Sequence, residues 1–163
     1  MAHRANFVII ENNEARAFYD QWAAATTALA LVDGPDEARL GAMDFEPTNG
    51  LLDWGEAEAG YLLDFDQSIC IVFGRPHPPP DDDSLDPEMR EMWEELLNKI
   101  EAGPKAFFEH IESEWQGWRL VWDERGTDGF AEHLASRGMS GVGMPAKNHP
   151  SDVSPPVEHR VPG

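Results

Sequence analysis

The sequence predicts an α+β fold in which an antiparallel sheet of about five strands carries helices mainly on one face. Three observations predict it. Residues 7–19 and 60–73 each have the pattern of a β-hairpin, a strand is predicted over 117–123, and an amphipathic helix begins just after residue 86. The predicted strands and helices show no regular β–α alternation, which disfavours a doubly wound parallel sheet.

The first hairpin lies near the start of the sequence. Residues 7–10 are apolar and mostly β-branched, Asn12 and Asn13 follow, and residues 16–19 supply the second strand. Asparagine tolerates the left-handed backbone conformations that tight turns require, so this pattern predicts two antiparallel strands joined by a short turn.

The segment between the hairpins is less regular. Residues 22–32 combine alanine, which favours helix, with threonine and valine, which favour strand, so both structures stay open there. Pro35 suits the first turn of a short helix over 35–43. A loop is predicted at 47–50, and residues 51–58 are predicted to form one helical turn or a second short helix.

The second hairpin is predicted over residues 60–73. Two apolar strands flank Asp66 and Gln67, and the second strand, 68–73, is apolar on both faces. Such a strand is expected at the centre of a sheet, covered by helices. Cys70 lies inside this run and is predicted to be a small buried core residue.

The clearest helix follows a Pro- and Asp-rich connector at residues 76–86, which consecutive prolines predict to be extended. Asp86 is the expected N-cap and Pro87 the first helical residue of a helix over 87–102. Six apolar residues recur along it at helical spacing: Met89, Met92, Trp93, Leu96, Leu97 and Ile100. A Gly-Pro pair ends it, and a second helix is predicted over 105–115.

The remaining elements are a strand over 117–123 and a helix over 127–136 with Thr127 as its N-cap. We therefore predict one domain over residues 1–138, with the connector inside it. The tail over 139–163 is rich in Pro, Gly and Ser without periodicity, and it is predicted to be extended or flexible.

Composition limits the classes of protein to which the chain can belong. The 163 residues include 31 Asp plus Glu but only 12 Lys plus Arg, a net charge of -19, and 41% of residues are hydrophobic. A packed core is therefore expected, whereas binding to nucleic-acid phosphates or to anionic lipid is not, because both need clustered cations. One cysteine cannot form a disulfide framework or a cysteine zinc site. Without a secretory leader pattern or a membrane-spanning stretch, a cytoplasmic location is predicted.

The negative charge is concentrated in residues 81–115, which hold 12 acidic and three basic residues. Eight acids form the predicted interaction surface: Asp81, Asp82, Asp83, Asp86, Glu88, Glu91, Glu94 and Glu95. Such a run is either a solvated helix face with its linker or a docking surface for a basic protein. A cation site is a third reading, but the run lacks the spaced ligands and turn glycine of a calcium loop.

A second candidate group is the pair Asp64 and Asp66. Two carboxylates at this spacing can face the same way and hold Mg²⁺ or Ca²⁺, or work as an acid–base pair together with a histidine. The simpler interpretation is that Asp66 caps the turn and Asp64 lies on the solvent face. His110 and His133 lie beside acids on predicted helices, and neither belongs to a metal-ligand motif.

The six tryptophans are many for this length. Most are expected in the core, whereas an exposed tryptophan among acids would mark a protein interface.

Six blocks of sequence resemble a group of uncharacterised bacterial proteins, mainly actinobacterial. The blocks occur in the same order at residues 18–22, 33–35, 51–54, 58–66, 71–74 and 117–123. The resemblance spans roughly residues 6–137. It implies no activity, cofactor or site residue.

Three functional hypotheses follow. The first is a small acidic protein-interaction module, immunity- or inhibitor-like, with mimicry of nucleic acid as its extreme form, that binds a basic partner. The second is a metal-dependent enzyme that uses Asp64 and Asp66. The third is a generic domain whose acidic surface is an adaptation to salt. We assign no catalytic residue and no cofactor from the sequence.

Overall fold

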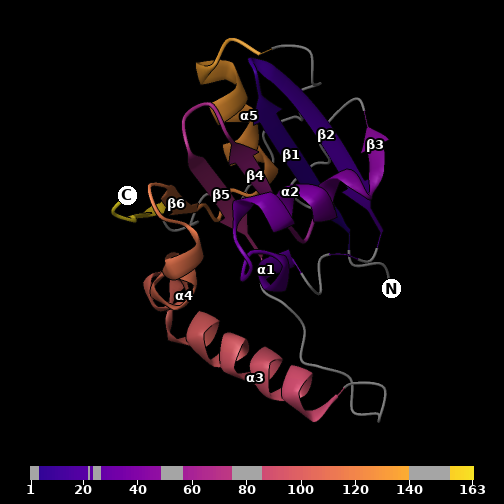
Figure 1. Cartoon of the computed structure of the whole chain (residues 1–163). Coiled ribbons are helices and arrows are strands. Elements are labelled where there is room, and N and C mark those ends of the chain that lie inside the picture. Colours follow the sequence, from indigo (N-terminus) through magenta and orange to yellow (C-terminus); the bar gives the residue numbers. More distant parts are fainter. Residues whose placement is uncertain (1–3, 22, 24–26, 49–56, 75–85, 140–154) are drawn as a thin grey trace.

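A seven-stranded sheet forms the centre of the fold (Figure 1). The structure is a computed structural model, and it describes residues 4–21, 23, 27–48, 57–74, 86–139 and 155–163. The strands are β1 (Ala5–Glu11), β2 (Glu14–Asp20), β3 (Glu46–Thr48), β4 (Ala59–Asp64), β5 (Ile69–Phe73), β6 (Arg119–Trp122) and β7 (Val157–Arg160). Their order is β3-β2-β1-β4-β5-β6-β7, and β5 is buried along its whole length, as expected for a central strand.

The sheet is mixed, which corrects the prediction of an antiparallel sheet of about five strands. Both predicted hairpins are present, because β1 pairs antiparallel with β2 and β4 pairs antiparallel with β5. However, β1 pairs parallel with β4, and β5 pairs parallel with β6. A parallel pair needs a long crossover connection, and helices lie in the connection between β5 and β6. Turn signals predict each hairpin but not how one hairpin pairs with the next element.

The sequence also does not predict the two edge strands of the observed sheet, β3 and β7. β3 occupies part of the predicted loop at 47–50, and β7 comes from the predicted tail and pairs antiparallel with β6. Both strands are short, and most of their residues are polar, charged or proline. Edge strands commonly carry such residues because they discourage pairing with other chains. The same residues hide these strands from a search for apolar runs.

The first hairpin turns as its asparagines predict. Asn12 and Asn13 have φ angles of 55° and 60°. Positive φ at two successive turn residues is what a type I′ hairpin turn requires. The turn between β4 and β5 ends at Ser68, which also has a positive φ, of 56°.

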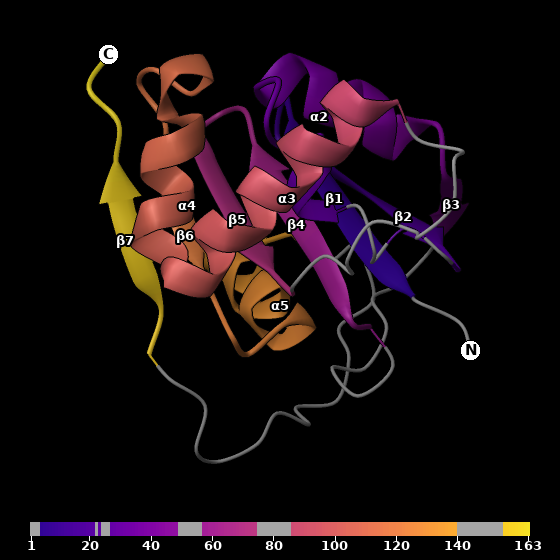
Figure 2. The ribbon, with the colours of Figure 1, turned by 90° about the horizontal axis from the view of Figure 1, so that it is seen from below.

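Helices cover both faces of the sheet. They are α1 (Thr27–Ala30), α2 (Pro35–Met43), α3 (Pro87–Ala102), α4 (Pro104–Ile111) and α5 (Thr127–Ser136). Figure 2 shows α2, α3 and α4 in front of the sheet and α5 behind it. A large core cluster joins one face of the sheet to α1, α2, α3 and α4, whereas a smaller cluster joins the other face to α5 through Phe130 and Leu134. The prediction that helices pack mainly on one face of the sheet is therefore confirmed for four helices, whereas α5 packs on the other face.

The ends of the helices follow local chemistry. The Asp86 carboxylate accepts a hydrogen bond from the Glu88 N–H, and Gly103, with φ of 128°, follows the last residue of α3, so both predicted ends are confirmed. α4 is shorter than predicted and continues into a 3-10 turn at Glu112–Glu114. In α5 the N-cap is Gly126 and not Thr127, which is a buried residue of the first turn.

Two buried hydrogen bonds join parts of the helical layer to each other and to the sheet. The indole N–H of Trp115 donates to the Leu31 carbonyl at 2.8 Å, and the Tyr61 hydroxyl of β4 donates to the Ala38 carbonyl of α2 at 2.6 Å. Cys70 is buried as predicted, and burial raises the pKa of its thiol. Most of the predicted elements at 51–58 and 76–86 lie outside the described residues.

Gly60→Ala is expected to destabilise the fold by about 3 kcal/mol, because overpacking inside a sheet forces backbone to move. A Cβ on Gly60 in β4 would collide with the backbone carbonyl oxygen of Asn6 in β1. The control is Gly41→Ala in α2, where the nearest heavy atom, the Tyr61 hydroxyl, lies 3.9 Å from the added Cβ. Replacing a helical glycine should stabilise by about 0.5–1 kcal/mol. Urea unfolding measures both variants, and equal stabilities would contradict the described packing.

Candidate functional site

Five of the eight predicted interaction residues lie in the described part of the chain, and all five are exposed. They form what we call the acidic face of α3: Asp86, Glu88, Glu91, Glu94 and Glu95. Asp81, Asp82 and Asp83 lie outside the described residues. The sequence prediction of an exposed acidic helix surface is therefore confirmed for the helix, while its use as a binding face stays a prediction.

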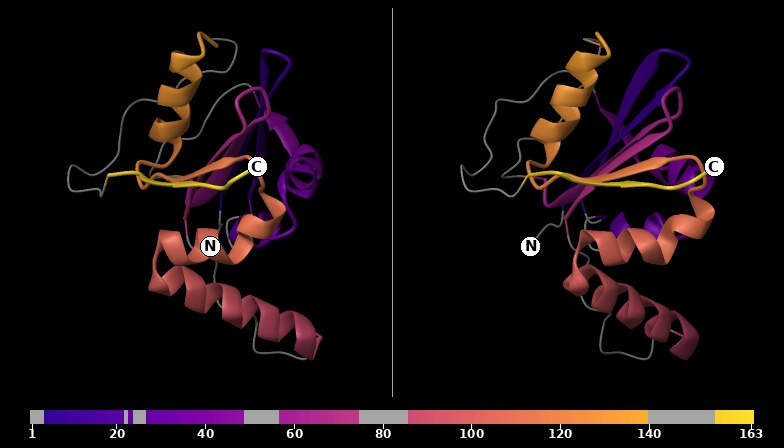
Figure 3. Two further views of the ribbon diagram at one scale, coloured as in Figure 1. Left: turned by 60° about the vertical axis from the view of Figure 1, so that its left-hand side comes forward. Right: turned by 90° about the vertical axis from the view of Figure 1, so that its left-hand side faces the viewer.

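The other side of α3 attaches the helix to the fold. Its buried residues are Trp93, Leu96 and Ile100, and the last two belong to the large core cluster. The helix packs chiefly on α4 and lies at the outside of the molecule in both views of Figure 3. The acidic face consequently points away from the apolar contacts that hold α3 in place.

The acids of this face repel one another. Glu88, Glu91 and Glu95 follow at intervals of three and four residues, and side chains so spaced are neighbours on a helix. Each like-charge pair at such spacing destabilises a helix by about 0.2–0.5 kcal/mol. Within the described residues, no cation forms an ion pair with Glu88, Glu91, Glu94 or Glu95. The fold thus tolerates a concentration of charge that it does not neutralise.

Asp64 and Asp66 occupy the opposite roles to those that the simpler interpretation gave them. Asp64 is fully buried, not on the solvent face, and its Oδ1 accepts the Gln67 N–H at 3.0 Å, so it is Asp64 that caps the turn. Asp66 is more exposed. Its two carboxylate oxygens accept the N–H groups of Asn12 and Asn13, each at 2.9 Å. Asp66 therefore ties the second hairpin to the turn of the first.

Arg137, just after α5, brings the two carboxylates together. Its Nη1 lies 2.6 and 2.8 Å from the two oxygens of Asp64, and its Nη2 lies 3.1 Å from Oδ2 of Asp66 and 3.0 Å from Oδ1 of Asn13. These contacts raise the pKa of the Arg137 guanidinium, with the hydrogen bond to Asp64 as the largest cause. One guanidinium thus binds the end of α5 to both hairpins.

His133 completes this group, and we call the set of Asp64, Asp66, His133 and Arg137 the Arg137 network. The Nε2 atom of His133 lies 2.9 Å from Oδ2 of Asp64. The sequence predicts an ordinary helical histidine beside an acid at His133, and no prediction was made for Arg137. Their four-residue spacing, which puts both side chains on one face of α5, was the signal available.

The Arg137 network has the chemistry of a structural ion pair. A buried carboxylate needs a cation and further hydrogen bonds, and Asp64 has both. The guanidinium lies where a metal ion shared by the two aspartates would have to bind. Among the residues that the structure describes, no group of three or more His, Cys, Asp or Glu side chains is placed to hold a metal ion. This geometry does not favour the metal-dependent enzyme.

A second arginine, just before α5, is held in the same manner. Arg125 donates to both oxygens of Asp123, at 2.7 and 3.0 Å, and also pairs with Glu132 of α5. These partners raise the pKa of Arg125. Each of these arginines, Arg125 and Arg137, thus contacts two carboxylates.

None of the tryptophans that the structure describes stands exposed among acids. Trp93, Trp115 and Trp122 are buried, and Trp118 is half-buried, whereas Trp22 and Trp54 lie outside the described residues. The large exposed hydrophobic side chain on α3 is instead Met89, which is 42% exposed.

No protein-family model matches this sequence, and no match was found among curated proteins or solved structures. The resemblance to a group of bacterial proteins therefore stays a prediction, and any function has to be argued from the geometry. Within the described part of the chain, none of the helices combines the length and the apolar character that crossing a membrane requires.

Arg137→Met is expected to cost about 3–5 kcal/mol, because it leaves the buried Asp64 carboxylate without its cation. The matched control is Arg16→Met, which removes an exposed arginine 3.9 Å from Glu11 and should change stability by less than about 0.5 kcal/mol. Adding Asp64→Asn to Arg137→Met should recover part of the loss, since the uncompensated charge disappears. Urea unfolding decides, and similar costs for the two single variants would rule out this role for Arg137.

The ionisation of Asp66 makes the free energy of unfolding depend on pH in the acidic range. The Asn13 N–H, and to a lesser degree Arg137 and the Asn12 N–H, hold the pKa of Asp66 below its ordinary value of 3.8. The ionised form is therefore favoured by folding, so this stabilisation is complete above the unfolded-state pKa and is lost as pH falls through the folded-state pKa. We expect Asp66→Asn to flatten the stability profile below about pH 4. Parallel profiles of the two proteins in urea unfolding would contradict this.

Proposed function

We propose that this protein is an interaction module that binds a basic protein through the acidic face of α3. The observation that carries the proposal is the set of exposed glutamates on α3 that pair with no cation in the described part of the chain. A partner that brings Lys or Arg side chains to this face would relieve the mutual repulsion of the acids. The proposal extends to the immunity- or inhibitor-like class of such modules.

The position of α3 supports the proposal. A helix that packs chiefly on one neighbour leaves much of its circumference free for a partner, and α3 packs chiefly on α4. Charge on such a face acts mainly on encounter, since it steers an oppositely charged protein and discriminates against acidic ones.

Met89 supplies an apolar contact beside these charges. It lies one residue from Glu88, near the start of α3, and is 42% exposed. Methionine is enriched in protein interfaces because its flexible side chain adapts to different surfaces. An exposed methionine beside the acidic face of α3 favours a protein-binding site.

The experiment compares two variants that remove the same number of charges. The test variant carries Glu88→Gln, Glu91→Gln, Glu94→Gln and Glu95→Gln on α3. The control carries Glu14→Gln, Glu37→Gln, Asp44→Asn and Glu46→Gln, which are also exposed but lie on β2, α2, β3 and the segment between α2 and β3. Each immobilised protein is exposed to the proteins of its natural host at low and at raised salt, and retained proteins are identified and then purified for binding measurements.

We expect a basic protein that wild type and the control variant retain at low salt, with affinity for the α3 variant about tenfold or more weaker, the scale of electrostatic steering. Raised salt should weaken the wild-type complex toward the level of the α3 variant. Equal losses in the two variants would favour a generic acidic surface adapted to salt. Retention of no basic protein at low salt would overturn the proposal.

A further inference from the structure

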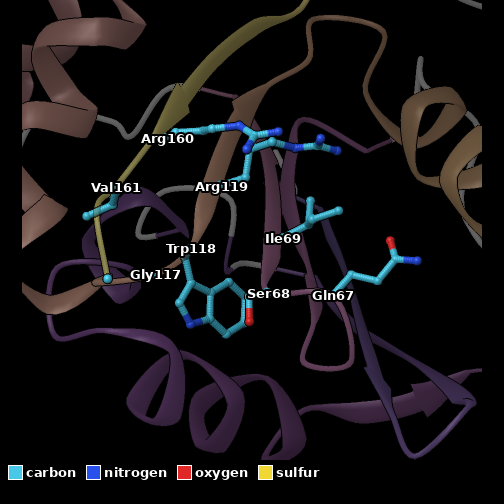
Figure 4. A pocket seen from close by; sticks show the side chains of 9 residues that line it. Gln67, Ser68, Ile69, Gly117, Trp118, Arg119, Arg160 and Val161 are labelled. Atoms are coloured by element: carbon cyan, nitrogen blue, oxygen red, sulfur yellow. The ribbon is translucent and has the colours of Figure 1, made fainter.

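A cavity of about 290 Å³ lies where β5, β6 and β7 meet, on elements other than α3. Six side chains line most of it: Gln67, Ser68, Ile69, Trp118, Arg119 and Arg160. Figure 4 shows the two arginine side chains running in the same direction at the top of this cavity, with Trp118 and Ser68 below them. The site is unusual in this chain because it gathers positive charge in a protein whose net charge is -19.

The sheet register places the two arginines together. Arg119 of β6 is the direct partner of Arg160 of β7 in the antiparallel ladder, so both side chains stand on the same face. Like charges directly opposite each other in a sheet are destabilising. The fold maintains this pair at the edge of the sheet at a cost that an anion between the two side chains would remove.

The cationic pair is poorly neutralised within the protein. The nearest carboxylate to Arg119 in the described part of the chain is that of Glu158, with Oε1 4.0 Å from Nε. That Nε atom is buried, and its N–H donates to no acceptor among the described residues. Arg160 has no ion pair within the same residues. By contrast, Arg125 and Arg137 are each held by two carboxylates.

The rest of the cavity suits a small oxyanion. Guanidinium groups present several N–H donors in a fixed plane that matches the oxygens of phosphate. The Ser68 hydroxyl and the Gln67 amide are neutral donors among the lining side chains. The indole of Trp118 packs away from the two guanidiniums, against Phe65 and Trp115. A volume of about 290 Å³ is at the lower end of small-molecule sites, so it fits a small metabolite and not a polymer.

We propose that this cavity binds the phosphate group of a small phosphomonoester between Arg119 and Arg160. The phosphate oxygens accept hydrogen bonds from the N–H groups of both guanidiniums. This site is independent of the acidic face of α3, so the chain carries one surface for a basic protein and one cavity for a small anion.

The test uses inorganic phosphate as the probe, titrated into the full chain at constant ionic strength. Isothermal titration calorimetry gives the affinity, and amide NMR shifts of Gln67, Ser68 and Trp118 locate the site. We expect saturable binding to wild type that weakens at least tenfold in Arg119→Met and in Arg160→Met. Arg160→Lys, which keeps the charge but loses the planar donors, should fall between wild type and Arg160→Met.

Two controls separate a built site from general attraction to cations. Arg16→Met removes an exposed arginine on β2, and the α3 variant removes four acids, so both should bind phosphate within about twofold of wild type because both leave the cavity intact. The proposal is overturned if phosphate does not saturate wild type, if Arg160→Met binds as well as Arg16→Met does, or if acetate binds as tightly as phosphate. Arg160→Met should fold without loss of stability, since it removes a repulsion.

Discussion

A buried carboxylate has to meet a cation, and the packing of α5 depends on how Asp64 meets Arg137. Asp64 ends β4 inside the fold with no exposed surface, and Arg137 bonds to both of its oxygens. Because the same guanidinium also reaches Asp66 and Asn13, it fixes the end of α5 over two hairpins at once. That contact holds α5 against the smaller core cluster, on the face of the sheet where α5 is the only helix among those described. Removing Arg137 would leave the Asp64 carboxylate without its arginine in a place that water cannot reach.

The same rule separates the charges that serve the fold from those that remain available. Arg137 pairs with Asp64 and Asp66, and Arg125 pairs with Asp123 and Glu132. The glutamates on the acidic face of α3 have no cationic partner in the described residues. Arg119 and Arg160 lie opposite each other in the sheet, and within the same residues their one ion pair is the 4.0 Å contact of Arg119 with Glu158. Both features cost the isolated protein a little electrostatic repulsion. These two groups of like charges are places where we expect other molecules to bind.

Local signals in the sequence predicted the local structure well. The Asn12–Asn13 turn, the N-cap at Asp86, the stop at Gly103 and the apolar stripe of α3 all depend on residues close together in the chain, and the structure contains each of them. The mixed sheet was not predictable in this way, because the pairing of β1 with β4 joins segments about fifty residues apart and depends on the packing of whole elements. β7 was missed because its residues are mostly polar. The exposed acids of α3 could be predicted because a local helical pattern places them. The Arg119–Arg160 pair became visible only once the strands had their register, and the contact of Arg137 with Asp64 joins segments far apart in the chain.

We propose that the acidic face of α3 is a binding surface and not only a solvated helix. The most direct test of this proposal is the association rate constant of the purified basic partner, measured by stopped flow over a range of ionic strength. Electrostatic steering by this face predicts that the rate for wild type falls steeply with salt, that the rate for the α3 variant is lower and nearly independent of salt, and that the charge-matched control on β2, α2, β3 and the α2–β3 segment behaves as wild type does. If both variants lost the same part of the salt dependence, the charge would act as a diffuse coat, and the account given for α3 would be wrong.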